Sequence, residues 1–145
     1  MAGKKEGTEG MSPSDYKRIL IKVQLREIAL AACSVKTRLQ CLPDGETLKV
    51  FPGYNIRHDL LDDHTAMIYP SFNLVATPST KKEYAISLQC TFRLTYYSQE
   101  ELTLDFLEIF MKRNVPLNAW PYFREFVQNM TQRMNIPPLV LPLIA

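Results

Sequence analysis

The fold is decided by residues 114–145, NVPLNAWPYFREFVQNMTQRMNIPPLVLPLIA. Their centre predicts an amphipathic helix over about 118–135, since apolar side chains recur at spacings of three and four and therefore share one face. These side chains are Trp120, Phe123, Val127, Met130 and Met134. We expect Asn118 to cap the start of this helix and Pro121 to fall in its first turn, where a missing N–H costs nothing.

Paired prolines follow the helix. The residue before a proline avoids the α region, so Pro137 and Pro138 are expected to stop the helix. The segment after them, LVLPLI at 139–144, is apolar and extended. We expect it to lie against another part of the molecule.

These residues resemble a known family. The run WPYFRE at 120–125, with Arg133-Met134 and PPLVLP at 137–142, is similar to the C-terminal signature of the SecB family. Members of that family are bacterial cytosolic chaperones that hold unfolded precursors for export. The match is closest to the shorter SecB-like proteins and is specific over about residues 114–142.

The resemblance implies an α+β protomer, in which a four-stranded antiparallel β-sheet carries the C-terminal helices on one face and the signature helix lies at a tetramer contact. It also implies a dimer of dimers that binds unfolded polypeptide clients without ATP or another cofactor. Export-type members dock on the SecA motor through acidic sheet residues. Here the net charge is +2, and the polar face of the strand at 84–97 carries only Arg93, so the residues give SecA docking no support.

Composition places the chain among ordinary globular proteins. With 145 residues and a hydrophobic fraction of 46%, we expect a disordered tail over 1–11 and one domain over 12–145. No apolar run approaches the roughly 18 residues of a membrane span, and the small net charge argues against a nucleic-acid partner. The odd number of cysteines, without CxxC spacing, favours a reducing cytoplasm and inert core thiols: Cys33, Cys41 and Cys90.

The first third of the chain predicts a helix and a strand. Ser12 and Pro13 are start signals for a helix over about 13–22. Residues 25–38 favour a strand, with a bulge near Glu27-Ile28 where the alternation slips. Pro-Asp-Gly chemistry then predicts a turn at 42–46.

Two further strands and a poorly patterned region follow. Over 47–64 we expect only a short strand at 48–51, with a Pro-Gly turn after it. Residues 66–76 predict a strand whose Pro70 suggests an edge position. Residues 84–97 alternate strictly, which predicts an antiparallel strand with one covered face and one wetter face.

A helix is expected from Ser98 to about Arg113, with Ser98 and Glu101 forming a capping box. It is apolar on most sides, so we expect the sheet to cover one side and another subunit the other. Val115-Pro116 then separates it from the next helix.

Aromatic and methionine side chains are concentrated in the C-terminal half. Ordinary core explains most of them, but the apolar faces exceed what one small sheet covers, and such residues suit surfaces that accept many partners. The candidates for client binding are Tyr96, Tyr97, Phe106, Phe110, Tyr122, Phe126, Met130 and Met134. We assign Trp120, Phe123, Phe92 and Leu94 to the core. The polar flank of Arg124, Gln128 and Gln132 is assigned to the oligomer interface.

Catalysis has no support in the sequence, which lacks a Gly-rich phosphate loop, a nucleophile elbow and an HExxH motif. The run HDLLDDH at 58–64 contains metal-ligand residue types, but its spacing matches no ligand set, so we expect a solvated polar loop. Three hypotheses remain: a general SecB-like holdase linked to export, a dedicated chaperone of one partner such as an antitoxin, and an enzyme with a metal at 58–64.

Overall fold

The computed structural model describes residues 11–38, 40, 47–137 and 139–142. Its elements, in chain order, are α1 (Pro13–Leu20), β1 (Val23–Thr37), β2 (Leu48–Asp62), β3 (Thr65–Pro78), β4 (Ile86–Ser98), α2 (Leu104–Arg113) and α3 (Val115–Arg133). The predicted tail lies outside the described residues except for Met11, which packs against the core. The turn expected at 42–46 also lies outside them.

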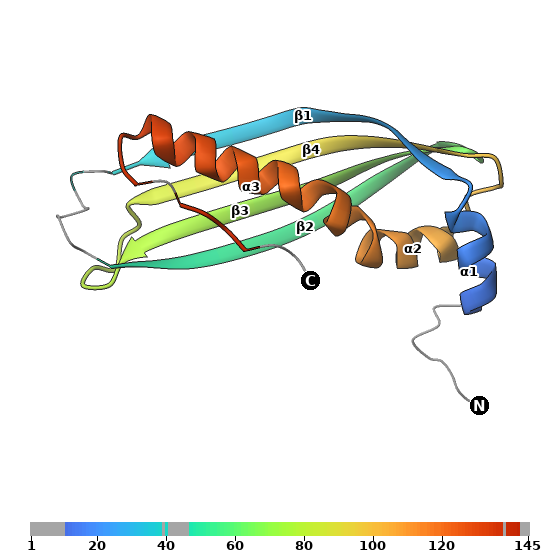
Figure 1. The fold of residues 1–145 in the computed structure, drawn as a ribbon, viewed down its shortest axis with the longest axis horizontal. Helices are drawn as coiled ribbons and strands as arrows, with labels where there is room; N and C mark the ends of the chain where they lie inside the picture. The colour runs from blue at the N-terminus through green and yellow to red at the C-terminus, as the bar shows by residue number, and fades with distance from the viewer. Residues whose placement is uncertain (1–10, 39, 41–46, 138, 143–145) are drawn as a thin grey trace.

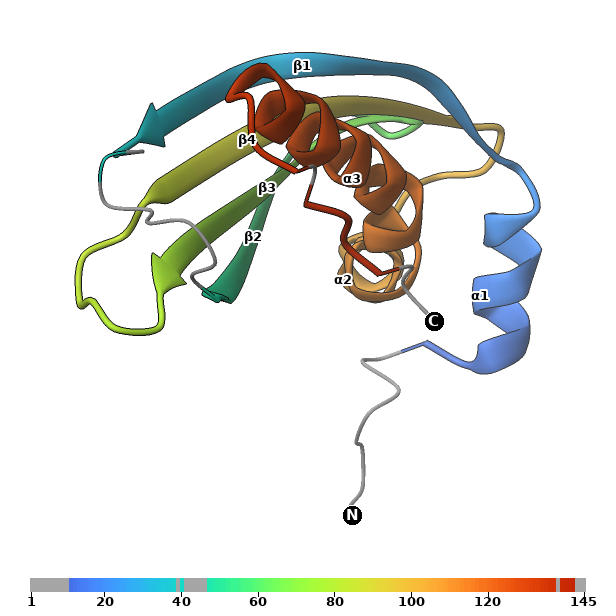
Figure 2. The same ribbon diagram turned by 60° about the vertical axis from the view of Figure 1, so that its left-hand side comes forward.

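The strands form one antiparallel sheet in the order β1-β4-β3-β2. The sheet is long and curved, and α2 and α3 lie on its concave face (Figures 1 and 2). The expected α+β architecture, with four antiparallel strands and C-terminal helices on one face, is therefore confirmed. No helix in the described ranges is long and apolar enough to cross a membrane.

Strand β4 has the alternation that its sequence predicts. Every second residue from Ile86 to Ser98 is buried beneath the helices, and the residues between them are partly or fully exposed. The strand begins at Ile86 rather than at Tyr84. Its position at the centre of the sheet explains why its two faces differ so clearly.

The beginning of the chain also follows its local signals. The Ser12 hydroxyl accepts a hydrogen bond from the Asp15 N–H at 3.1 Å and caps α1, which ends at Leu20. The pairing of β1 with β4 shifts register between Leu25 and Glu27, which confirms the expected bulge.

Strand β2 was not predicted over most of its length. We expected a short strand and a Pro-Gly turn, but Pro52 and Gly53 lie inside a continuous strand, where they pair with Leu74 and Asn73 of β3. Because β2 is an edge strand with most of its side chains exposed, its sequence is free of strict alternation. A proline is tolerated at such an edge.

Strand β3 is central rather than at the edge that Pro70 suggested. Its predicted buried face is confirmed, because alternate residues from Ala66 to Pro78 are buried. The register with β4 runs to the pair Ile68–Leu94 and resumes at Ser71–Thr91. The sheet thus accommodates Pro70, which has no N–H to donate, by interrupting one ladder locally.

Helix α2 begins later than expected. Thr103, whose Oγ1 accepts a hydrogen bond from the Phe106 N–H at 3.1 Å, is its N-cap, so the predicted capping box at Ser98 is wrong. Ser98 instead ends β4, and its N–H donates to the His64 carbonyl at 2.8 Å. Strand pairing therefore takes precedence over a local helix signal.

Helix α3 starts earlier than expected, because the chain turns from α2 into α3 at Asn114 with no linker. Pro116 occupies the first turn, so Pro121 lies inside the helix. Asn118 does not cap the helix; its side chain faces the core. At the other end, Asn135 has a positive φ of 62°, a left-handed conformation that ends the helix before the paired prolines.

Candidate functional site

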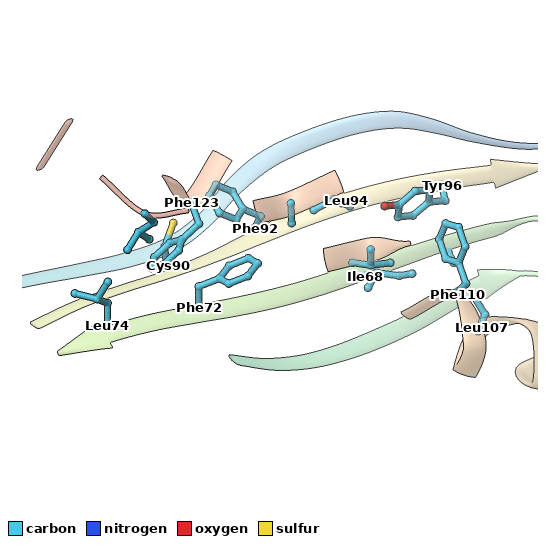
Figure 3. Packing of buried hydrophobic residues seen from close by; sticks show 14 of the residues in the cluster. Ile68, Phe72, Leu74, Cys90, Phe92, Leu94, Tyr96, Leu107, Phe110 and Phe123 are labelled. Atoms are coloured by element: carbon cyan, nitrogen blue, oxygen red, sulfur yellow. The ribbon is translucent and has the colours of Figure 1, made fainter. Parts of the chain in front are cut away.

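Aromatic rings fill the space between α3 and the sheet. Phe123 stacks on Phe72 of β3 with ring centroids 4.9 Å apart, and Trp120 lies 5.7 Å from the same ring. Phe72 also meets Phe92 of β4 edge-on with ring centroids 6.4 Å apart, and Figure 3 shows these rings of Phe72, Phe92 and Phe123 in the core. Phe92, Leu94 and Phe123 are buried, while Trp120 is half-buried and packs against this core.

A second aromatic group lies where α2 covers the other end of the sheet. The Tyr96 ring meets Phe110 edge-on at 4.8 Å, and Phe106 stacks between Phe110 and Tyr16 of α1. The Tyr96 hydroxyl accepts a hydrogen bond from Asn118 Nδ2 at 2.8 Å. Burial raises the pKa of Tyr96 to about 12, against the smaller lowering effect of the Asn118 bond.

The structure does not bring the predicted client-binding residues together on one surface. Tyr96, Phe106 and Phe110 are at most 3% exposed and lie inside the protomer. Tyr97 lies on the opposite face of the sheet, under the Arg26 guanidinium at 4.3 Å. Tyr122 is exposed. The others are half-buried: Phe126 and Met130 on α3, and Met134 at its C-cap.

The apolar segment after α3 runs back along that helix (Figures 1 and 2), and we call Leu139–Pro142 the strap. The Leu139 N–H donates to Thr131 Oγ1 at 3.0 Å. Arg124 Nε donates to the Leu141 carbonyl at 2.8 Å, and Trp120 Nε1 to the Pro142 carbonyl at 2.7 Å. The expectation that this segment lies against the molecule is confirmed for residues 139–142, and residues 143 and 144 lie outside the described ranges.

Side-chain burial along the strap is uneven. Leu141 is 7% exposed and belongs to the core, whereas its neighbour Val140 is 62% exposed. Sequence reasoning missed the contacts of Arg124 and Thr131 with the strap. The family resemblance joins two sequence runs, WPYFR at 120–124 and PPLVLP at 137–142. No pattern within either run indicates that side chains of the first bond the main chain of the second.

The polar side of α3 carries two of the residues assigned to an oligomer interface. Gln128 and Gln132 are exposed and, with Glu125 and Asn129, line a shallow hollow of about 200 Å³. Arg124, the third, is half-buried and engaged with the strap.

Apolar side chains remain exposed along β1 on the face that carries the helices. Leu25, Leu30 and Val35 pair with buried residues of β4, which places them on that face. They are nevertheless 41%, 53% and 39% exposed, because α3 lies over β3 and β4 rather than over β1. We call these three residues the β1 flank.

A similar surface lies along β2. Tyr54, Ile56 and Leu60 pair with buried residues of β3, and we call them the β2 flank. Tyr54 and Leu60 are exposed. Tyr54 and Ile56 border a hollow of about 420 Å³, whose other walls come from α2 and the start of α3: Glu108, Met111, Lys112 and Pro116. The sequence does not predict this flank, because residues 52–62 of β2 lack a recognisable strand pattern.

The other face of the sheet carries both charged and aromatic side chains. Arg57 stacks over Tyr69 at 3.9 Å, and Arg93 pairs with Glu27 at 3.1 Å. This face therefore presents guanidinium groups supported by tyrosine rings and by an ion pair.

The run at 58–64 is mostly strand rather than a polar loop. Residues up to Asp62 belong to β2, and only Asp63 and His64 form the turn into β3. His64 Nδ1 lies 3.0 Å from the Ser98 carbonyl oxygen. Among the described residues, no group of three His, Cys, Asp or Glu side chains could hold a metal ion.

Two cysteines lie directly opposite each other. Cys33 of β1 pairs with Cys90 of β4, and both are free thiols. Cys90 is buried, which raises its pKa to about 12, but Cys33 is exposed and so is not the core thiol we expected. Cys41 lies outside the described residues.

Comparison with known proteins gives a match in structure alone. No family profile and no curated protein matches this sequence. A SecB-like chaperone of Mycobacterium tuberculosis, solved with a ChAD peptide from the HigA1 antitoxin, superposes with a TM-score of 0.77 at 18% identity, over 90% of this chain and 99% of that chain. A protein of unknown function from Streptococcus agalactiae gives a TM-score of 0.48 at 12% identity, over 83% of this chain and 97% of that one. The chain therefore has a SecB-like fold, as its C-terminal residues predict.

Proposed function

We propose that this protein is an ATP-independent chaperone that holds unfolded or extended segments of other polypeptides. The observation that carries the proposal is the pair of apolar flanks beside the helical layer. Leu30 of the β1 flank is 53% exposed and Tyr54 of the β2 flank 43%, although both lie on the covered face. Exposed apolar surface of this kind, bordered by polar groups, is typical of sites that bind other polypeptides.

The SecB-like fold supports the same role. The solved Mycobacterium tuberculosis chaperone of this fold binds a peptide from an antitoxin. We infer that this chain likewise binds peptide segments, in the cytoplasm, with no catalytic group, metal or nucleotide taking part.

A dedicated role with one partner, such as an antitoxin, is the second candidate. The partner of the solved chaperone favours it. The open face of the sheet carries charges of both signs, Arg57 and Arg93 as well as Glu27 and Asp59. This mixed face favours a dedicated role over docking on SecA, which export-type proteins do through acidic residues.

We also propose that the chain self-associates, as a dimer of dimers. The outer edge of β1 has no neighbouring strand in the sheet, and unpaired edges are templates for pairing with another chain. Exposed Gln128 and Gln132 would contribute a polar contact between protomers. Sedimentation at micromolar concentration should give a multiple of 16.7 kDa, and a monomer would contradict this proposal.

Aggregation of an unfolded model protein, followed by light scattering without nucleotide, tests the chaperone role. We expect suppression at a few-fold molar excess of the chain. A purified chain that suppresses nothing, but carries one polypeptide from its native host, would support the dedicated role instead. A chain that does neither would remove the proposal.

A further inference from the structure

The strap is held through its main chain. Trp120 Nε1, Arg124 Nε and Thr131 Oγ1 bond main-chain atoms of Pro142, Leu141 and Leu139 in turn. We call these three α3 side chains the rack. Residue numbers increase from Trp120 to Thr131 along α3, while those of their strap partners decrease from Pro142 to Leu139. The strap therefore runs antiparallel to α3.

Leu141 is the most deeply buried side chain of the strap, and Leu139 packs partly buried against the core. Leu141 is 7% exposed and packs into the core, whereas Val140 points to solvent at 62% exposure. Main-chain hydrogen bonds are the same for every residue type except for proline, which lacks the N–H. The rack therefore requires an extended main chain with an apolar side chain at the place of Leu141 and a partly buried one at the place of Leu139, whereas the side chain at the place of Val140 is free to vary.

We propose that the rack is a peptide-binding site, that the strap is its resident occupant, and that extended apolar segments of client polypeptides displace the strap. This inference rests on the chaperone role proposed above and names the site at which a client main chain is bound. The ligand is an extended peptide that offers a carbonyl to Arg124, another to Trp120 and an apolar side chain at the place of Leu141.

Covalent attachment to α3 explains how the strap can occupy the rack in the free protein and still be displaced by a client peptide. A segment joined to α3 by a few residues competes at a high effective concentration, although its own contacts are few. A free peptide binds only to the fraction of molecules whose strap has left. Loosening the strap should therefore raise the affinity for a peptide.

The test uses the full chain and a fluorescein-labelled peptide with the sequence of residues 136–144, IPPLVLPLI. In Leu141→Ala the strap loses its buried side chain, and we expect the peptide to bind about tenfold more tightly than to the unmodified chain. Val140→Ala, which alters an exposed side chain of the same strap, is the matched control and should leave the affinity unchanged. Equal affinities for all three chains would overturn the proposal.

Hydrogen exchange of the unmodified chain provides a second measurement that needs no variant. The Leu139 amide is protected by Thr131 Oγ1 in the docked strap. Saturating peptide should speed its exchange several-fold, while the amides of β4 keep their protection. Bound peptide with unchanged exchange at Leu139 would place the peptide elsewhere and overturn the proposal.

A further pair of variants tests the rack itself. In the Leu141→Ala background, Arg124→Gln should weaken peptide binding several-fold, because it removes the donor to a main-chain carbonyl. Arg133→Gln makes the same charge change at a site where the side chain bonds Asn129 of its own helix, and it should have no effect. Equal losses from both substitutions would point to charge alone and contradict the rack.

The failure of this inference differs from the failure of the proposed function. If the unmodified chain suppresses aggregation but Leu141→Ala binds the peptide no better, the chaperone role stands and the rack does not. If no chain suppresses aggregation or binds the peptide, both are overturned.

Discussion

The centre and the flanks of the helix-covered face of the sheet both carry apolar side chains, but the helices bury only those of the centre. In the centre, Phe72 and Leu94 are at most 3% exposed beneath the helices. On the β1 flank, Leu25 and Leu30 point to the same side of the sheet and are 41% and 53% exposed. The sheet is wider than its helical layer, so the side chains of the centre are buried within the protomer and those of the flanks stay exposed.

Truncating a side chain to alanine in the centre and on the β1 flank should give the largest difference in the free energy of unfolding. Phe123→Ala in the centre is expected to lower the free energy of unfolding by about 3–5 kcal/mol, since it leaves a cavity against Phe72. Leu30→Ala on the flank should change it by less than about 0.5 kcal/mol. Denaturant unfolding measures both. A large loss at Leu30 would show that a partner chain covers the β1 flank in solution.

Trp120→Ala tests the border of the centre. The ring is half-buried against Phe72 and Phe123 and also bonds the strap, so we expect a loss of about 2–3 kcal/mol, below that of a fully buried aromatic residue. Because these contacts lie within one protomer, the number of subunits should stay the same in sedimentation. A folded variant that sediments as a smaller species would show that the ring packs between protomers.

The loss of folding stability at alkaline pH should be larger for a tyrosine in the centre, Tyr96, than for one on the β2 flank, Tyr54. Burial raises the pKa of both Tyr96 and Tyr54 to about 12, above the ordinary value of 10. A raised pKa in the folded state leaves stability intact below pH 10 and removes it as pH rises toward 12, because the unfolded chain loses its proton first.

We expect Tyr96 to contribute a loss on the order of 2 kcal/mol over this window, and Tyr54 less, since Tyr54 is 43% exposed. Urea unfolding at pH 9 and pH 11, compared among the unmodified chain, Tyr96→Phe and Tyr54→Phe, measures this. A steeper dependence from Tyr54 than from Tyr96 would contradict the assignment of centre and flank.

The two paired cysteines give the smallest effect and the simplest test. In a Cys41→Ser background, iodoacetamide should modify exposed Cys33 in the native protein and buried Cys90 only after unfolding. Peptide mapping by mass spectrometry measures the two rates. Similar native rates would mean that α3 opens readily over β4.

The sequence by itself determined the parts whose pattern is local. Alternation from Ile86 to Ser98 places β4 and its buried face, and Ser12 places the start of α1. The C-terminal residues led to the SecB-like fold. The signals for β4 and α1 are each complete within one element, because they depend on local alternation and on a local capping hydrogen bond.

Only the tertiary structure decided what covers each apolar side. An edge strand meets water on much of its surface, so β2 carries no alternation by which it could be recognised. Thr103 caps α2 because strand pairing holds Ser98. Tyr96 is buried and Leu30 is exposed, since the helices lie over β4 and leave much of β1 exposed. Arg124 contacts the strap because the chain folds back after Asn135. A sequence shows where apolar and polar groups are; the contacts that cover them join residues far apart in the chain.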